Sequence, residues 1–152
     1  MSFNRTYSIS GLHRMGIAFN TMYGLPTPHS PIINHETDRR LLKFEEMLLD
    51  ELSEIEEVIN ETDPVKKAVK LADLLGDIIV YCVTESVRHG IDIDAVLETI
   101  EASNKTKLGD DGKPIVVEGK VQKGPNFQPP EGMIEEIIRD SSFRDIVRAG
   151  DQ

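Results

Sequence analysis

The spacing of apolar residues predicts a chain of helices. In residues 37–61, apolar side chains recur every three or four positions, which is the period of one helical face. Residues 65–89 are apolar on nearly all sides, which predicts a helix buried against several neighbours. Asp63-Pro64 separates these two helices, and Gly90 ends the second one.

Shorter periodic segments predict three further helices, over residues 9–23, 92–103 and 131–150. Residues 26–35 contain three prolines and little periodicity, which predicts a connection between two helices. Residues 104–123 are rich in lysine and glycine, which predicts a basic loop. Its short Ile-Val-Val run is either a strand or an extended segment. We therefore expect an all-α fold, a bundle of four to five helices with this loop after the fourth. The all-round apolar character of residues 65–89 predicts that oligomerisation completes the bundle.

Length and composition fit one domain. The chain has 152 residues, of which 39% are hydrophobic, enough for a core. We expect a single domain over residues 1–152, with residues 36–123 carrying the functional site. The formal net charge of -10 argues against a protein that binds the phosphate backbone of a nucleic acid.

The sequence also predicts a cytoplasmic location. Cys82 is the single cysteine and lies in an apolar run, so we interpret it as a small core residue in a reducing compartment. The first residues, MSFNRTYSISGLHRMGIAF, lack the continuous apolar region of a secretory signal. No later apolar run reaches the roughly 18 residues that cross a bilayer, so we expect no membrane association.

Four acidic residues interrupt the apolar helices at helical spacing. With about 100° per residue, Glu51 falls about 60° from the centre of the apolar stripe of residues 37–61, and Glu54 lies one turn further on. Asp73 and Asp77 lie four residues apart on a face of the next helix that we expect to be acidic and buried. Because an ionised carboxylate removed from water needs a cation or becomes neutral, these pairs predict a metal site.

The expected ion is Mg²⁺, with Mn²⁺ as the alternative. Carboxylate oxygens are the hard ligands that these ions prefer. The histidines lack the clustered spacing of a zinc site; they are His13, His29, His35 and His89. A competing interpretation makes each aspartate part of a core ion pair, with candidate partners Lys70, Arg39, Arg40 and Arg88.

Five segments in a fixed order carry a family resemblance. They are AFNTMYGLP, DELSEI with its Glu-x-x-Glu spacing, LADLLGDIIVYC with its aspartates, HGIDIDAVLETIEASNKTKLGDDGKP and GKVQKGPNFQPPE. Each alone is weak, because such acidic spacings arise often by chance. Together they resemble the MazG-like, all-α nucleoside triphosphate pyrophosphatase superfamily, in the branch similar to phosphoribosyl-ATP pyrophosphohydrolase. The resemblance covers roughly Ala18 to Glu131.

This resemblance implies Mg²⁺-dependent cleavage of a nucleotide between its α and β phosphates, which releases a monophosphate and pyrophosphate. Carried over by motif, the metal ligands are Glu51, Glu54, Asp73 and Asp77, with Glu51 and Glu54 also catalytic; the general base is Glu54 or Asp50. The nucleotide contacts implied are Asn104, Lys107, Lys120 and Lys123. Relatives commonly form homodimers or homotetramers.

One departure keeps other interpretations open. The family commonly has a glutamate three residues before an aspartate, where this chain has Lys70 before Asp73 and Leu74 before Asp77. Without this glutamate, the protein either has fewer or weaker metal sites or uses Glu85 as the replacement ligand. A further alternative is a non-catalytic module that binds nucleotide or metal. A purely structural helical protein is the third interpretation.

Overall fold

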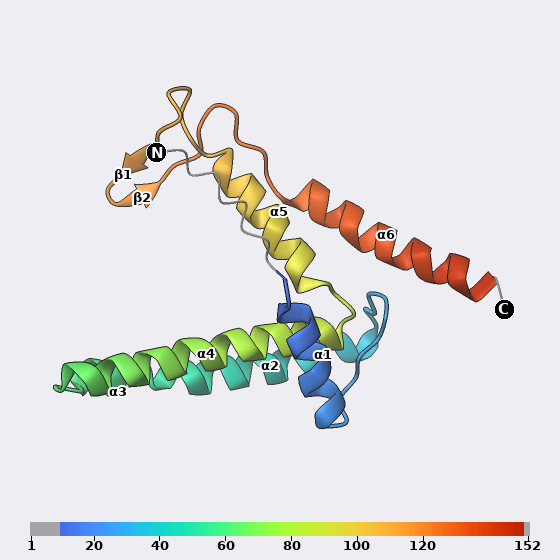
Figure 1. Ribbon diagram of the computed structural model, residues 1–152, viewed down its shortest axis with the longest axis horizontal. Coiled ribbons are helices and arrows are strands. Elements are labelled where there is room, and N and C mark those ends of the chain that lie inside the picture. The colour runs from blue at the N-terminus through green and yellow to red at the C-terminus, as the bar shows by residue number, and fades with distance from the viewer. Residues whose placement is uncertain (1–9, 151–152) are drawn as a thin grey trace. The chain divides into compact units, whose positions relative to one another are not determined.

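The computed structural model describes residues 10–150, with the side chains of residues 10–141 (Figure 1). The regular elements of the described residues are helices apart from one short hairpin, which confirms the all-α prediction. The elements are α1 (Leu12–Met22), α2 (His35–Ser53), α3 (Ile55–Asn60), α4 (Pro64–Arg88), α5 (Ile93–Lys105), β1 (Val116–Val117), β2 (Lys120–Val121) and α6 (Glu131–Gly150). Residue 9 of the first predicted helix lies outside the described range.

The helix predicted over residues 37–61 is divided into α2 and α3. Glu54 caps the end of α2, and its N–H donates to the carbonyl groups of Glu51 and Leu52. The Ser53 hydroxyl donates to the Asp50 carbonyl over 2.6 Å. A serine that bonds back to a carbonyl of the preceding turn competes with the helical ladder and bends it, which accounts for the break at this point.

Helix α4 is the long element against which α2 and α3 lie (Figure 1). The Asp63 carboxylate caps it by accepting from the N–H groups of Val65 and Lys66, both over 2.9 Å. Pro64 stands at the first helical position, where its missing N–H costs nothing. The Asp63-Pro64 separation predicted from the sequence is therefore confirmed.

The core lies where α1 meets the second half of α4. Val83 and Val87 are almost fully buried, and a Cβ added to Gly16 of α1 would meet both side chains at 2.8 Å. The Asn20 amide donates to the carbonyl groups of Thr84 and Pro26, each over 3.1 Å. Gly16 thus permits the close helix contact, and the buried Asn20 fixes it.

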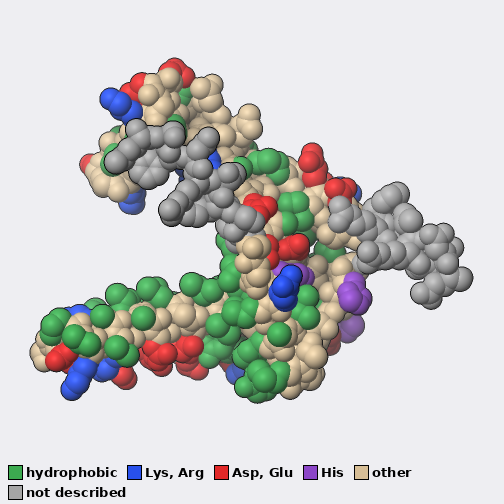
Figure 2. All heavy atoms as spheres, viewed as in Figure 1, with side chains coloured by type: hydrophobic (Ala, Val, Ile, Leu, Met, Phe, Trp, Pro, Cys, Tyr) green, Lys and Arg blue, Asp and Glu red, His purple; other side chains and the backbone are tan. Residues whose placement is uncertain are grey.

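The first part of α4 is less buried than the sequence predicts. Leu71, Leu75 and Ile79 are 43%, 51% and 51% exposed. Cys82 is exposed as well, so its interpretation as a core residue is wrong. Apolar side chains also gather along the outside of α3 and α4 (Figure 2). Within residues 13–91, α2 and α3 lie against α4 and α1 packs on Val83 and Val87, whereas the three apolar side chains named above stay exposed.

The described residues divide into two compact units, residues 13–91 and residues 92–150 with 10–12. In the second unit, α5 contacts α6 and the basic loop folds back onto the end of α5. The Ser103 hydroxyl donates to the Gln128 carbonyl over 2.7 Å, and the Gly124 N–H donates to the Lys107 carbonyl over 2.9 Å. The Ile-Val-Val run supplies strand β1, which pairs antiparallel with β2.

Candidate metal and phosphate site

Glu51 is the buried member of the predicted metal ligands. It is 9% exposed, as its place inside the apolar sector of α2 predicts. Hydrogen bonding to its carboxylate raises the pKa of the Tyr81 phenol on α4. The Glu51 Oε2 atom is buried without a hydrogen-bond partner. An unpaired buried carboxylate oxygen is costly, so this atom fits a bound cation.

The other predicted ligands, Glu54, Asp73 and Asp77, are exposed carboxylates. The negative charge of Glu51 raises the pKa of Glu54 most strongly, followed by partial burial and by the charges of Glu57, Asp77 and Asp73. The charges of the other three predicted ligands, from α2 and α4, therefore act on Glu54. The expectation that the face of Asp73 and Asp77 is buried is wrong, because both side chains are exposed.

Two of the basic residues proposed as ion-pair partners of Asp73 and Asp77 are paired with other acids. Lys70 Nζ lies 3.5 Å from Glu61 Oε2, and Arg39 Nη1 lies 3.8 Å from Glu36 Oε2. Among the ion pairs of the described residues, none contains either Asp73 or Asp77. The competing interpretation of these aspartates as ion-pair partners is therefore wrong.

Glu85 is not free to replace the missing family glutamate. Arg40 Nε donates to both of its oxygens over 3.1 and 3.0 Å, and His89 Nε2 lies 2.9 Å from Oε1. Leu74, at the other departing position, is a core residue that is 4% exposed. Both side chains thus serve the packing of α4 rather than the acidic cluster.

Tyr81 and the Arg40, Glu85 and His89 network were missed by reasoning from the sequence. Tyr81 follows Asp77 by four residues and so shares its helical face, which is the signal that points to it. In the described part of the chain, no three acidic, histidine or cysteine side chains are grouped tightly enough to hold a metal ion as they stand. Because Glu54, Asp73 and Asp77 are exposed, their rotamers are free to turn toward Glu51.

The predicted nucleotide contacts belong to the other unit. Lys123 Nζ lies 4.8 Å from the centre of the Phe127 ring, and Lys107 Nζ lies 5.9 Å from it. Asn104 and Lys120 are exposed. The folded loop therefore brings Lys107 and Lys123 to one aromatic ring, where two ammonium groups share a small area of surface.

Glu54→Gln is expected to stabilise the metal-free protein at pH 7. The pKa of Glu54 is raised above its ordinary value of 4.5, so the folded state binds this proton more tightly than the unfolded state. Stability is then lost as the pH rises above about 4.5 toward the folded-state pKa. Urea unfolding in EDTA at pH 7 and pH 4 tests this. A stabilisation by Glu54→Gln that is as large at pH 4 as at pH 7 would contradict the repulsion.

Comparison with solved structures finds proteins of similar fold. Among them, a crystal structure from Exiguobacterium sp. 255-15, of a protein provisionally named an NTP pyrophosphohydrolase, aligns with a TM-score of 0.47 and 23% sequence identity. The alignment covers 90% of this chain and 97% of that one. No protein-family model and no curated protein matches the sequence. The described residues include no helix that is long and apolar enough to cross a membrane.

Proposed function

We propose that this protein is a Mg²⁺-dependent nucleotide pyrophosphohydrolase. It cleaves between the α and β phosphates of a nucleoside triphosphate or phosphoribosyl-nucleotide and releases a monophosphate and pyrophosphate. The observation that carries the proposal is the buried, unpartnered Glu51 Oε2 among three further carboxylates. The order of the sequence motifs supports the reaction class.

Glu51, Glu54, Asp73 and Asp77 would hold the divalent ion, either Mg²⁺ or Mn²⁺. When bound, such an ion neutralises phosphate charge, polarises the scissile phosphorus and makes water a stronger nucleophile. Tyr81 orients Glu51 through its hydrogen bond, so that this carboxylate is fixed while the exposed ones adapt. A carboxylate left outside the ion's coordination acts as general base, and Glu54 and Asp50 are the candidates.

The basic loop supplies the positive charge that a triphosphate needs. Lys107 and Lys123 lie over the Phe127 ring. An aromatic ring of this kind also offers a surface on which a nucleobase can stack. We infer that Asn104, Lys107, Lys120 and Lys123 contact the nucleotide. Lysine acts there as a flexible point charge toward phosphate oxygens.

Incubation with a panel of substrates tests the proposed reaction. The purified protein is mixed with Mg²⁺ and ribo- or deoxyribonucleoside triphosphates or phosphoribosyl-ATP, and monophosphate and pyrophosphate are quantified. We expect both products in equal amounts from at least one member, and none in EDTA. Release of inorganic phosphate and a diphosphate instead would contradict cleavage between the α and β phosphates.

A non-catalytic module that binds nucleotide or metal is the second candidate. One observation favours it: Lys70 stands at a position where the family commonly has a glutamate, and it is paired with Glu61. This candidate predicts Mg²⁺-dependent binding of a nucleotide without products. The panel assay therefore separates the two functions.

We also infer that the protein is a homodimer or homotetramer that covers the exposed apolar face of α4. Leu71, Leu75 and Ile79 follow one another every four residues and are half exposed, so they form a continuous stripe. Leu75→Asp is expected to halve the molar mass measured by light scattering at micromolar concentration. Leu108→Asp, at an exposed leucine of the loop, is the matched control. A wild-type monomer would contradict this inference.

A further inference from the structure

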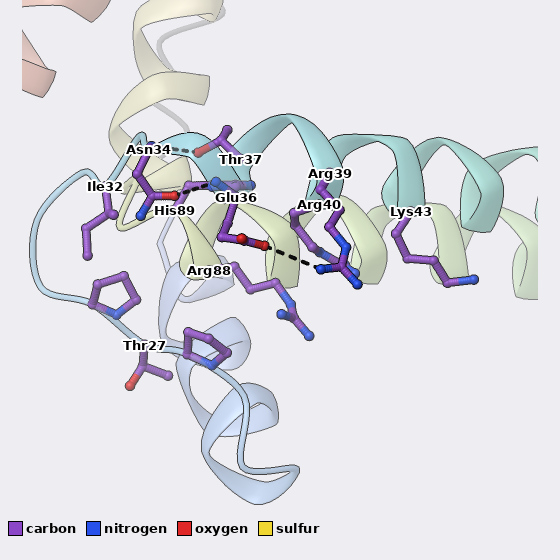
Figure 3. Close-up of a pocket in the computed structure, with 12 residues that line it drawn as sticks. Thr27, Ile32, Asn34, Glu36, Thr37, Arg39, Arg40, Lys43, Arg88 and His89 are labelled. Atoms are coloured by element: carbon purple, nitrogen blue, oxygen red, sulfur yellow. Dashed lines mark hydrogen bonds and ion pairs between the residues drawn. The ribbon is translucent and has the colours of Figure 1, made fainter.

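A second candidate site is a cavity at the other end of the α2 and α4 pair. Its volume is about 540 Å³, which lies within the usual range of small-molecule pockets. The connection between α1 and α2 forms an apolar wall from Pro26, Pro28 and Ile32. The opposite wall comes from α2 and α4 and carries four basic side chains and one acid, namely Arg39, Arg40, Lys43, Arg88 and Glu36. Figure 3 shows the ends of Arg39, Arg40 and Arg88 extending to the same side, whereas Lys43 extends away along α2.

The cations of this cavity differ in how they are neutralised. Arg40 is paired with the buried Glu85, and Arg39 contacts Glu36 only at 3.8 Å. Arg88 belongs to none of the ion pairs found among the described residues. The charge of Glu85 favours the charged form of Arg88, but Glu85 is already paired with Arg40 and His89. Arg88 therefore keeps the capacity to bind an added anion.

Arg88 is the cation of this cavity whose surroundings disfavour its charged form. Burial lowers the pKa of its guanidinium most strongly, the neighbouring positive charge of Arg40 lowers it further, and the negative charge of Glu85 offsets part of this. A charged group that is partly withdrawn from water and lies beside a like charge is unfavourable unless an opposite charge is added. An anion bound at Arg88 would reduce this repulsion between Arg88 and Arg40. A guanidinium group also binds the oxygens of a phosphate in a bidentate manner.

The cavity is distinct from the carboxylate cluster. Arg40 precedes Glu51 by eleven residues on α2, and Arg88 follows Asp77 by eleven residues on α4. At 1.5 Å per residue the two sites are roughly 16 Å apart along both helices. One phosphate group therefore does not reach both, and this site does not depend on the proposed function.

We propose that this cavity binds a phosphate monoester with an apolar or aromatic body. The phosphate dianion lies against Arg88 and Arg39, and the apolar body lies against Pro26, Pro28 and Ile32. Neither group requires a divalent ion. Binding there gives the protein a second ligand site, separate from the one assigned to the pyrophosphohydrolase reaction.

Calorimetric titration with adenosine 5′-monophosphate in EDTA tests this proposal. Without a divalent ion, the acidic cluster repels phosphate, so that binding reports on the cavity. We expect Arg88→Gln to weaken binding about tenfold or more, as loss of a charge-assisted contact predicts. Arg39→Gln, at a side chain that is 85% exposed, changes binding in the same direction without disturbing the fold. Inorganic phosphate is expected to bind more weakly, because it lacks the body that contacts the apolar wall.

Arg14→Gln is the matched control, since this exposed arginine of α1 is not part of the cavity. No binding to the wild type in EDTA, or equal weakening by Arg14→Gln and Arg88→Gln, would overturn the proposal. Weakening by Lys107→Ala but not by Arg88→Gln would place the ligand on the basic loop and overturn it too. Each of these failures leaves Mg²⁺-dependent turnover unaffected, so it is distinguishable from a failure of the proposed function.

Discussion

Glu51→Gln is expected to lower Mg²⁺-dependent release of pyrophosphate by at least about 100-fold, the loss typical of removing one preorganised electrostatic contact. Glutamine keeps the size of the side chain and a carbonyl oxygen for the hydrogen bond with Tyr81. It removes the negative charge of the buried Oε2. The metal-free variant is expected to be at least as stable as the wild type, because repulsion with Glu54 is relieved.

Initial rates across a Mg²⁺ titration measure this effect, with urea unfolding in EDTA as the test of folding. Glu45→Gln is the matched control, since Glu45 lies on the exposed side of α2; its rates are expected to equal those of the wild type. If Glu51→Gln keeps full activity, then the site lies elsewhere. If it unfolds in EDTA, then Glu51 serves the fold rather than an ion.

Arg40→Met is expected to lower the free energy of unfolding by about 3 kcal/mol or more, which is typical of a broken buried ion pair. Arg40 Nε donates to both oxygens of Glu85, which is only 5% exposed. Without this arginine, the carboxylate keeps His89 as its contact but loses its permanent cation. The pair also joins α2 to α4, so its loss weakens the frame that positions Glu51. Urea unfolding at pH 7 measures the change.

Two variants separate the cost of an unpaired charge from the loss of one side chain. Arg39→Met is expected to change stability by less than about 0.5 kcal/mol, because its contact with Glu36 is exposed. The double variant with Arg40→Met and Glu85→Met is expected to recover most of the stability, since apolar side chains of similar size replace such pairs well. A double variant as unstable as Arg40→Met alone would show that the unpaired carboxylate is not the cause.

Helix positions were predictable because their signals are local. The apolar period, Asp63-Pro64 and Gly90 lie within a few residues of the boundaries that they set. The break at Glu54 was not predicted, because the Ser53 hydroxyl has several available acceptors and the sequence does not say which it uses. The burial of α4 was overestimated for a different reason. Periodicity identifies which positions are apolar, but not whether another helix covers them.

In the candidate site, too, residues were predictable only where a local signal determines their position. Glu51 was placed correctly in the buried sector, because one helix face determines its position. Asp73 and Asp77 depend on what lies opposite them, and their exposure was not predicted. The partners of Glu85 come from two helices, so the pair with Arg40 joins residues 45 positions apart in sequence. No local pattern in a single sequence specifies that pairing.

Direct titration with Mn²⁺, followed by electron paramagnetic resonance of the free ion, tests whether the four carboxylates form a metal site. Wild-type protein is expected to remove the free-ion signal in a saturable manner, and Mg²⁺ is expected to compete. Glu51→Gln should weaken binding at least about tenfold, because a charged ligand is lost, whereas Glu45→Gln should not. Equal binding by wild type and both variants, or no saturable binding by the wild type, would contradict the assignment of Glu51, Glu54, Asp73 and Asp77 as ligands.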